Sequence, residues 1–304
     1  MTHNTRREGL VAIGELSRRT GVPVRTIRFY CDAGLLRPHR SSGGHRLFDP
    51  IAVDRLRSIR RLRALGLGLN AITTVLEGTV SLTEAVAAEQ AALDTELGEI
   101  MWRRATLAAA RDAPATARTR RLDLLATISD RHDAHNNLVT FWRQLLAPAP
   151  ASVFDAFVTM NVPAPPATPT PGQVVTYAEL VGATADPALA PAISRQLWRS
   201  DLTGIRHPRE LLAGIADACA MVDPLLTTRT PPRPGPELDC FLDAHTTARN
   251  ERDTPGFRQR LLLGADDSDP RLHRYWELTG AITATTTAGA ALRWLREALA
   301  QSRS

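Results

Sequence analysis

The residues best suited to chemistry lie between positions 24 and 31, in a short predicted helix. Val24, Ile27 and Cys31 have the spacing i, i+3 and i+7, which directs them to one inward face. Guanidinium groups bind phosphate or guanine through paired hydrogen bonds, and exposed aromatic rings lose hydrophobic free energy unless a partner covers them. Both kinds of side chain are predicted on the outward surface, which indicates a nucleic-acid partner. The outward residues are Arg25, Thr26, Arg28, Phe29 and Tyr30.

A second group of basic side chains lies in a predicted hairpin. The segments 37–40 and 45–48 flank Ser41-Ser42-Gly43-Gly44, whose glycines permit the positive φ angles that a hairpin turn requires. The sequence therefore predicts a small two-stranded β wing. Its basic residues are Arg40, His45 and Arg46, with His39 beside them.

Four short helices must position these side chains. Glycine after a helix and proline or asparagine at its start are the signals that define them. In the third helix Ala52, Leu56, Ile59 and Leu62 share an inward face. The predicted helices are 13–20 closed by Gly21, Pro23 to Gly34, a helix capped by Asp49 and ending at Leu65, and a short helix capped by Asn70.

The positive charge is concentrated near the N-terminus. The chain has a formal net charge of +5, but residues 1–70 contain 14 Arg and 5 acidic residues, which gives +9, while the remainder is −4. Such an uneven distribution is typical of nucleic-acid binding, with a solvated basic face as the alternative.

Several motifs in the first third of the chain form one recognisable set. They are Ile13-Gly14-Glu15-Leu16, Gly21-Val22, the run from Val24 to Tyr30, Gly34-Leu35-Leu36, the run from Gly44 to Phe48, and the run from Arg61 to Gly66. Together these motifs resemble the MerR family of transcription regulators, over about residues 10–111. Beyond this range the sequence resembles no family that we recognise.

This resemblance implies a winged helix-turn-helix that binds a pseudo-palindromic promoter operator as a homodimer and distorts it for RNA polymerase. We expect Arg25 and Thr26 near base edges in the major groove, and Arg28 and Tyr30 at phosphates or sugars. The wing would add backbone contacts through Arg46, Arg40 and His45, and Arg18 would anchor the first helix. Two residues depart from the family pattern, since Phe29 and His45 each stand where a tyrosine is common.

A long helix is predicted directly after this module. Ser81-Leu82-Thr83-Glu84 forms a capping-box pattern for a helix to about Arg111. Its apolar residues recur every seven positions, which favours a coiled-coil dimer contact, antiparallel by the resemblance. A surface helix packed on its own domain is the alternative. The predicted dimerisation residues are Val86, Leu93, Ile100 and Leu107, with Leu97 beside them.

We expect three segments: a DNA-binding domain at 1–80, the dimerisation helix at 81–112, and an all-α domain at 113–304. The fold class is therefore mainly α with a small β wing. Prolines after Pro114 mark loops between helices. The predicted helices of the last domain are 120–146, 152–160, 174–182, 188–202, 208–221, 238–250, 257–263 and 271–300, the last broken at Gly280.

The C-terminal domain is long enough to bind a small-molecule effector, which we expect to control the regulator. Trp142, Trp198 and Trp276 are candidates to contact such a ligand, because aromatic rings supply contact area and attract cations. Packing in the core is their alternative role. Two other functions remain open for this domain, which are binding of a partner protein and an unrecognised enzymatic activity.

Other classes of function lack a pattern to support them. The sequence has no GxSxG, P-loop, dinucleotide or HExxH motif, so we expect neither an enzyme nor a cofactor. Cys31, Cys219 and Cys240 are far apart and form no CxxC pair, which suits a reducing compartment. The resemblance disfavours a thiolate metal sensor, because this sequence lacks the cysteines that metal-sensing members carry at the start and far end of the dimer helix. His132 and His135 have i, i+3 spacing but no convincing third metal ligand.

The acidic stretch from Asp266 to Asp269 lacks the alternation of a calcium-binding loop and is explained equally well as a helix cap. No apolar run is long enough to span a membrane, and the polar start has no secretory core. We therefore expect a cytoplasmic protein.

Overall fold

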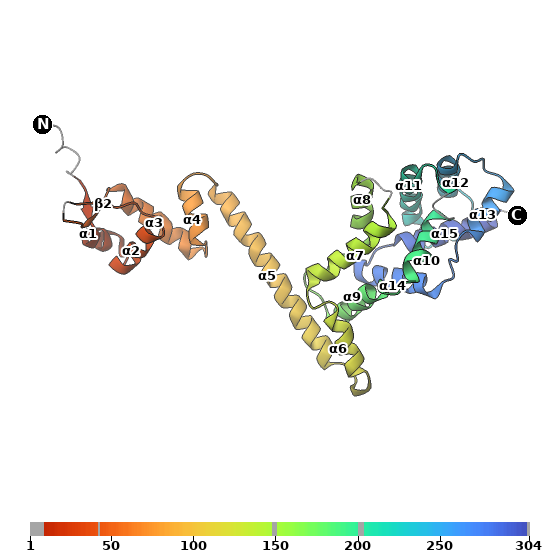
Figure 1. Cartoon of the computed structure of the whole chain (residues 1–304), viewed down its shortest axis with the longest axis horizontal. Coiled ribbons are helices and arrows are strands. Elements are labelled where there is room, and N and C mark those ends of the chain that lie inside the picture. The colour runs from red at the N-terminus through yellow and green to blue at the C-terminus, as the bar shows by residue number, and fades with distance from the viewer. Residues whose placement is uncertain (1–8, 42, 148–150, 200–203, 303–304) are drawn as a thin grey trace. The chain divides into compact units, whose positions relative to one another are not determined.

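The computed structural model describes residues 9–41, 43–147, 151–199 and 204–302. The chain is mainly helical with one small antiparallel sheet, as the sequence predicts. It divides into two compact units, Met1–Leu97 and Gly98–Ser304, which we call unit 1 and unit 2 (Figure 1). Each unit has its own hydrophobic core.

Unit 1 contains short helices around a three-stranded sheet. The described elements are β1 (Val11–Ala12), α1 (Ile13–Thr20), α2 (Val24–Asp32), β2 (His39–Arg40), β3 (Arg46–Phe48), α3 (Ile51–Ala64), α4 (Leu69–Leu76) and the first part of α5 (Leu82–Arg111).

The sheet has the order β1-β3-β2, with both pairs antiparallel. The predicted hairpin is present, and Arg40 lies opposite Arg46 in it. The strand β1 was not predicted, because two residues carry no alternating pattern that could reveal a strand. Its partner is β3, where Val11 pairs with Phe48.

The core of unit 1 confirms the predicted inward face of α3, since Ala52, Leu56, Ile59 and Leu62 are all buried. Two predicted caps are wrong. The N-cap of α3 is Pro50 without a side-chain hydrogen bond, and the N-cap of α4 is Gly68. The carboxylate of Asp49 instead lies 2.9 Å from the ring of His39.

Three arginines of α3 stabilise unit 1. Arg55 donates to the carbonyl of Leu35 at 2.7 Å, Arg60 to Thr20 at 2.8 Å, and Arg63 to Leu67 at 2.8 Å. A guanidinium group that donates to a backbone carbonyl satisfies an acceptor that a helix end or loop would otherwise leave without a partner. These guanidinium groups are therefore part of the fold, and the charge available to a ligand is less than the sequence total.

The long helix α5 begins with the predicted capping box. The backbone amide of Ser81 donates to the Glu84 carboxylate at 2.8 Å, and the amide of Glu84 donates to the Ser81 hydroxyl at 3.1 Å. Trp102, Ala105 and Ala109 of this helix are buried within unit 2.

Unit 2 is all helical in its described part, as predicted. Its elements after α5 are η1 (Ala115–Ala117), α6 (Arg118–Ala126), α7 (Arg131–Leu145), α8 (Ala151–Asn161), α9 (Pro171–Ala183), α10 (Leu189–Trp198), α11 (Pro208–Thr227), α12 (Pro236–Arg249), α13 (Pro255–Leu263), α14 (Pro270–Thr283) and α15 (Ala288–Gln301).

Three predicted helices differ from the structure. The single helix expected at 120–146 is two helices, because Asp130 caps a new start by accepting from the amides of His132 and Asp133. The last helix breaks at 284–287 and not at Gly280, since Ala284 has a φ of 54° and Thr287 caps α15. The predicted helix 188–202 ends at Trp198, and its expected last residues lie outside the described part of the chain.

Aromatic side chains form the centre of the unit 2 core. Trp142 is fully buried, and its indole N–H donates to the Tyr275 hydroxyl at 2.7 Å. The Trp142 ring also lies 4.7 Å from the ring of Phe157. The indole N–H of Trp276 donates to Gln196 at 3.0 Å. Each buried polar atom in this cluster thus has the hydrogen bond that burial requires.

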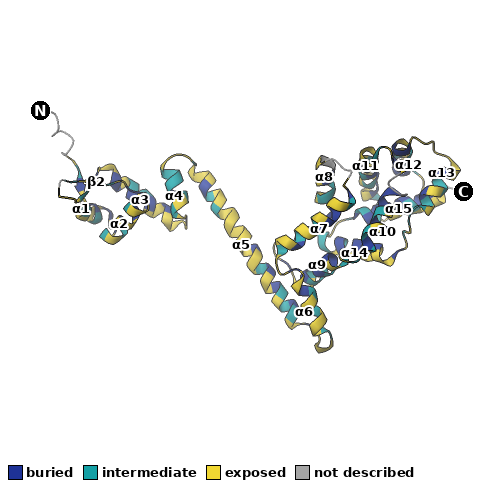
Figure 2. Cartoon of the chain, in the orientation of Figure 1, coloured by how far each residue is buried: buried dark blue, intermediate teal, exposed yellow. Residues whose placement is uncertain are grey.

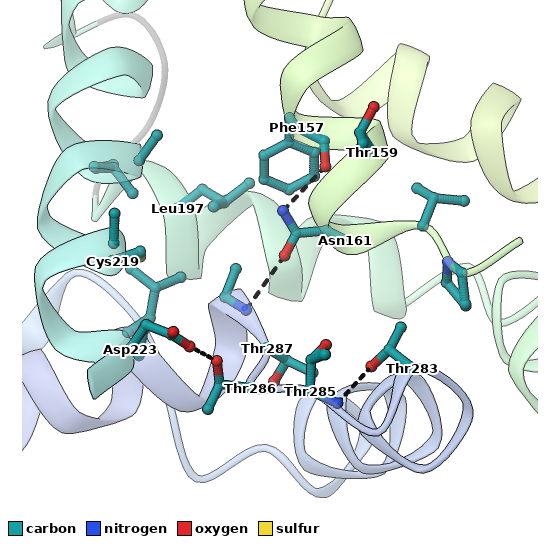
Figure 3. Close-up of a pocket in the computed structure, with 18 of the residues that line it drawn as sticks. Phe157, Thr159, Asn161, Leu197, Cys219, Asp223, Thr283, Thr285, Thr286 and Thr287 are labelled. Carbon is teal, nitrogen blue, oxygen red and sulfur yellow. Dashed lines mark hydrogen bonds between the residues drawn. The ribbon is translucent and has the colours of Figure 1, made fainter. Parts of the chain in front are cut away.

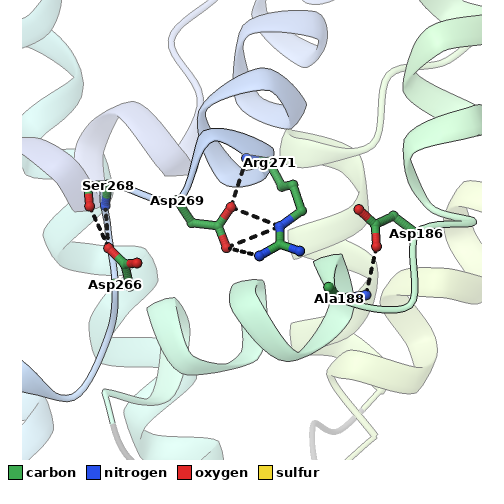
Figure 4. A network of polar contacts seen from close by, with 6 residues as sticks. All are labelled: Asp186, Ala188, Asp266, Ser268, Asp269 and Arg271. Carbon is green, nitrogen blue, oxygen red and sulfur yellow. Dashed lines mark hydrogen bonds and ion pairs between the residues drawn. The ribbon is translucent and has the colours of Figure 1, made fainter.

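The acidic stretch 266–269 organises the start of α14. Asp269 accepts from the backbone amide of Arg271 at 2.9 Å and pairs with its guanidinium, and Asp266 accepts from Ser268 (Figure 4). Asp267 is buried and pairs with Arg199. The stretch therefore acts as a cap and a buried ion-pair site.

Within the described residues, no helix combines the length and hydropathy needed to cross a membrane. Among the same residues, no three His, Cys, Asp or Glu side chains are grouped closely enough to hold a metal ion. The ring of His135 contacts the carbonyl of Pro163 at 3.2 Å.

A buried histidine on α12 has a lowered pKa. His245 is fully buried on α12, with its ring centre 4.4 Å from that of Phe241. Burial holds the pKa of His245 well below its ordinary value of 6.5, and the positive charges of Arg249 and Arg199 lower it further. Protonation is therefore easier in the unfolded chain than in the folded one.

We expect the free energy of unfolding to decrease as the pH falls below about 6.5, where the unfolded histidine takes up a proton and the folded one does not. His245→Gln should lack this part of the decrease, whereas the exposed His132→Gln should retain it. Urea unfolding at pH 7.5 and pH 5 measures the difference. Equal pH dependence in wild type and His245→Gln would contradict the assignment.

Candidate nucleic-acid interface and ligand cavity

The exposed face of α2 carries the predicted arginines. Arg25 and Arg28 are exposed, Thr26 is half-buried, and Phe29 is 54% exposed. In the part of the chain that the structure describes, Arg25 and Arg28 have no ion pair or side-chain hydrogen bond. Their donors are therefore free to bind an acceptor on another molecule.

Tyr30 does not belong to this face. The sequence predicts it outward, but its side chain is buried in the core of unit 1. The buried face of α2 is centred on Ile27 and Tyr30, which follow each other at i, i+3, and Cys31 is only half-buried. The predicted outward position of Tyr30 is wrong because Leu35 and Leu36 fold back toward it, and their amides both donate to its carbonyl. We therefore remove Tyr30 from the candidate contacts.

The hairpin presents a second positive surface. Arg40 and His45 are exposed, and Arg40 lies directly opposite Arg46 across the two strands. Like charges facing each other in an antiparallel pair are destabilising unless an opposite charge compensates them. In its turn Gly44 has a φ of 77°, as predicted, and Ser41 accepts from the amide of His45, while Ser42 lies outside the described residues.

One acidic residue that the sequence analysis missed joins the two surfaces. Asp32, the last residue of α2, lies 3.2 Å from the guanidinium of Arg46 in β3. This ion pair orients Arg46, whose side chain is half-buried. No spacing in the sequence relates these two positions, because only the turn of the chain between them brings them together. Arg18 is exposed and pairs with Glu15, so its anchoring role competes with that contact.

Sequence comparison places this interface in a known family. The profile described as MerR HTH family regulatory protein matches residues 11–79. The HTH-type transcriptional regulator MerD of Shigella flexneri is 36% identical over 97 residues, which are 32% of this chain and 79% of MerD. The chain belongs to the MerR family.

Other relatives share the same MerR-family segment. The nodulation protein NolA of Bradyrhizobium elkanii is 45% identical over 85 residues, which are 28% of this chain and 39% of NolA. The mercuric resistance operon regulatory protein of Bacillus cereus is 43% identical over 74 residues, 24% of this chain and 55% of that protein. The chain thus spans about two fifths of NolA. No solved structure matches the chain significantly.

The predicted dimerisation residues form an exposed apolar stripe on α5. Leu93, Leu97, Ile100 and Leu107 are each 55–63% exposed, and Val86 is half-buried. Figure 2 shows that much of α5 is exposed. The helical repeat places this stripe opposite the buried Trp102 face. The helix therefore has one apolar face inside its own chain and a second apolar face in solvent.

Unit 2 contains a cavity of about 650 Å³ that the sequence did not reveal (Figure 3). The side chains around it come from α8, α10, α11, the end of α14 and the start of α15. Its size is in the range of sites for drug-sized molecules. Its lining includes Phe157, Asn161, Leu212, Ile215, Cys219 and Asp223.

The tryptophans predicted as ligand contacts lie elsewhere. Trp142 and Trp198 are fully buried, and Trp276 is nearly so. None of the three lines this cavity, although Phe157 in its wall contacts Trp142. Trp276 borders a separate cavity of about 210 Å³. Their observed environment is that of core residues, which was the alternative role. A ligand site formed by helices distant in sequence has no local pattern, which explains why only the structure reveals it.

The cysteine thiols are poorly suited to ionisation. Burial raises the pKa of Cys219 to about 12, and burial also raises the pKa of Cys31 and of Cys240. The thiolate is the form that binds soft metals and reacts with electrophiles. Cys219 therefore contributes a small apolar group to the cavity wall.

Proposed function

We propose that this chain is a transcription regulator that binds a pseudo-palindromic promoter operator as a homodimer, under the control of a small molecule bound in unit 2. The observation that carries the proposal is the pair of unpartnered arginines, Arg25 and Arg28, on α2, next to the Arg-bearing hairpin of a MerR-family domain. Such a surface favours an anionic partner, and duplex DNA supplies phosphates along with base edges.

The contacts divide into two kinds. Arg25 and Thr26 lie near the start of α2, which favours contact with base edges when the helix enters the major groove. Arg28, Arg40, His45 and Arg46 would contact the phosphate backbone, where positive charge positions the protein without reading sequence. The exposed ring of Phe29 would pack against sugars or base edges and lose its contact with water.

The apolar stripe of α5 supports dimerisation, and charge supports an antiparallel arrangement. Between Leu82 and Glu99 the helix carries five acidic residues and no arginine, whereas its remainder carries Arg103, Arg104 and Arg111. Running two copies antiparallel sets the acidic half of one against the basic half of the other. A two-fold symmetric dimer in turn requires two related half-sites in the operator.

One antiparallel register fits the stripe well. If Leu93 lies opposite Ile100 of the partner subunit, the seven-residue repeat also sets Val86 opposite the partner's Leu107. The same register brings Glu89 opposite the partner's Arg104. Apolar and ionic matches thus occur together in a single alignment.

Two further steps complete the proposed mechanism. A bound dimer would distort the operator so that RNA polymerase engages the promoter differently. The resemblance to MerR-family regulators implies this step. The cavity supports a small-molecule signal, because unit 2 contains a largely apolar, half-open cavity of ligand size. A ligand controls DNA binding only as far as it prefers one conformation of the protein over another.

Arg25→Ala and Arg46→Ala test the interface in different ways. We expect Arg25→Ala to weaken binding to the upstream DNA of the gene by about 1–3 kcal/mol and to relax specificity at particular base pairs. Arg46→Ala should weaken binding to all sequences and lower the salt dependence by about one charge. Fluorescence anisotropy of the full-length protein over a range of salt concentrations measures both effects.

Arg274→Ala is the matched control, because it removes one exposed arginine from unit 2, where Arg274 pairs with Glu179. It should leave the affinity and the salt slope unchanged. Wild-type affinity in both Arg25→Ala and Arg46→Ala would exclude this surface as the DNA interface.

A further inference from the structure

The cavity in unit 2 has an uneven distribution of charge. Among the described residues that line it, Asp223 is the single charged side chain, and none of them is arginine or histidine. Asp223 is exposed at the cavity and accepts a hydrogen bond from the hydroxyl of Thr286 (Figure 3). It forms no ion pair with any residue that the structure describes. An aspartate carboxylate has more acceptor sites than one hydroxyl can fill.

A second acceptor lies one turn away on the same helix. Pro224 is inside α11 and has no N–H, so it cannot donate to the carbonyl of Ala220 four residues earlier. Ala220 also lines the cavity. The helix ends at Thr227, and the C-terminal end of a helix dipole attracts positive charge. These features favour a ligand group that is positively charged and carries several hydrogen-bond donors.

The rest of the cavity favours an apolar body. Leu197, Leu212, Ile215 and Leu292 contribute buried aliphatic surface. The amide of Asn161 is already engaged, because it donates to the carbonyl of Phe157 at 3.1 Å and accepts from the amide of Ala288 at 3.2 Å. The other polar side chains of the lining are threonines, and the hydroxyls of Thr159, Thr283 and Thr286 already donate hydrogen bonds within the chain. Asp223 is therefore the strongest acceptor that the lining offers to a ligand.

We propose that this cavity binds an amphiphilic cation, with an apolar chain or ring system among the aliphatic residues and a protonated amine at Asp223. This inference rests on the proposed role of unit 2 in receiving a small-molecule signal. An ammonium group has three donors and one charge, which match the carboxylate of Asp223 and the carbonyl of Ala220. An anionic amphiphile would face the same carboxylate and be repelled.

Three probes of equal chain length test the assignment: n-decylamine, 1-decanol and decanoate. Each is titrated calorimetrically into full-length protein at neutral pH, at concentrations where the probe is dissolved as single molecules. A primary amine is protonated under these conditions. We expect decylamine to bind more tightly than decanol, and decanoate to bind most weakly. Asp223→Asn should weaken decylamine binding by roughly tenfold, as loss of a charged hydrogen bond implies, and leave decanol binding unchanged.

Two other variants control the experiment. Asp217→Asn removes an exposed carboxylate from the same helix outside the cavity lining and should bind decylamine like wild type. Ile215→Trp fills the cavity and should abolish binding of both decylamine and decanol, with circular dichroism as the check that it folds.

Several results would overturn the inference. They are absence of binding by all three probes, equal affinity of wild type for decylamine and decanoate, and an equal effect of Asp223→Asn on decylamine and decanol. DNA titration of the same preparation separates this inference from the proposed function. Arg25-dependent DNA binding without amine binding rejects only the ligand class, whereas amine binding without DNA binding rejects the regulator proposal.

Discussion

Replacing Ile100 by glutamate is expected to convert the homodimer into monomers and to weaken operator binding by about 10²- to 10⁴-fold, because each monomer then binds one half-site without the other. Ile100 is 56% exposed in the single chain, so the substitution should leave the fold intact. In the proposed dimer it lies opposite Leu93 of the partner subunit, where two symmetry-related glutamates would be buried without partners. Light scattering and anisotropy titration measure the mass and the affinity.

Leu263→Glu is the matched control for this prediction. Leu263 is 74% exposed on α13, so the change introduces the same charge at an exposed leucine away from α5. It should remain dimeric and bind DNA like wild type. A dimeric Ile100→Glu protein with unchanged affinity would contradict the proposed use of the stripe and favour the alternative of a surface helix.

A charge swap distinguishes antiparallel from parallel pairing. Glu89→Arg places an arginine opposite the partner's Arg104 in the antiparallel register and should weaken the dimer by about 0.2–1 kcal/mol per pair. The double variant Glu89→Arg with Arg104→Glu should restore it. In a parallel dimer, position 89 would face position 89 of the partner subunit, and position 104 would face position 104. The second substitution would then not restore the stability of the dimer.

Trp142→Ala should reduce the free energy of unfolding of unit 2 by about 3–5 kcal/mol, a large fraction of the stability of a typical domain. The substitution removes a fully buried ring from the centre of the aromatic cluster and leaves the Tyr275 hydroxyl without its donor. The remaining cavity would be bordered by Phe157 and Trp276, which both contact the ring. Urea unfolding monitored by circular dichroism measures the change.

Trp142→Phe separates packing from hydrogen bonding, because it keeps an aromatic ring and removes the N–H. Its effect should be smaller than that of alanine. The same pair of variants tests the alternative reading of Trp142 as a ligand contact. A protein of wild-type stability that no longer binds decylamine would favour the ligand role and contradict the structural one.

The helices of unit 1 were predictable because their signals are local. The bounds of α1 follow from Gly21, whose φ is 67°, and the inward face of α3 follows from the spacing of its apolar residues. The capping box at Ser81 likewise acts within four residues. Tyr30 shows the limit of this approach, since its burial depends on how the following loop folds back over α2.

The candidate DNA interface was only partly predictable. The spacing of α2 correctly exposed Arg25, Arg28 and Phe29. It could not show that Asp32 pairs with Arg46, nor that Arg55 donates to backbone carbonyls. These contacts join residues 14 to 21 positions apart, which no local pattern relates.

By itself the sequence determined the family of the N-terminal segment, the order of most helices, the apolar stripe of α5 and the excess of arginine near the N-terminus. Each of these depends on residue types at short and regular spacing. Only the tertiary structure decided which arginines are free, that the tryptophans belong to the core, and that α8, α11 and α15 enclose a cavity with Asp223 at its edge. These properties arise from contacts between helices far apart in the chain, where packing brings together side chains that no local pattern relates.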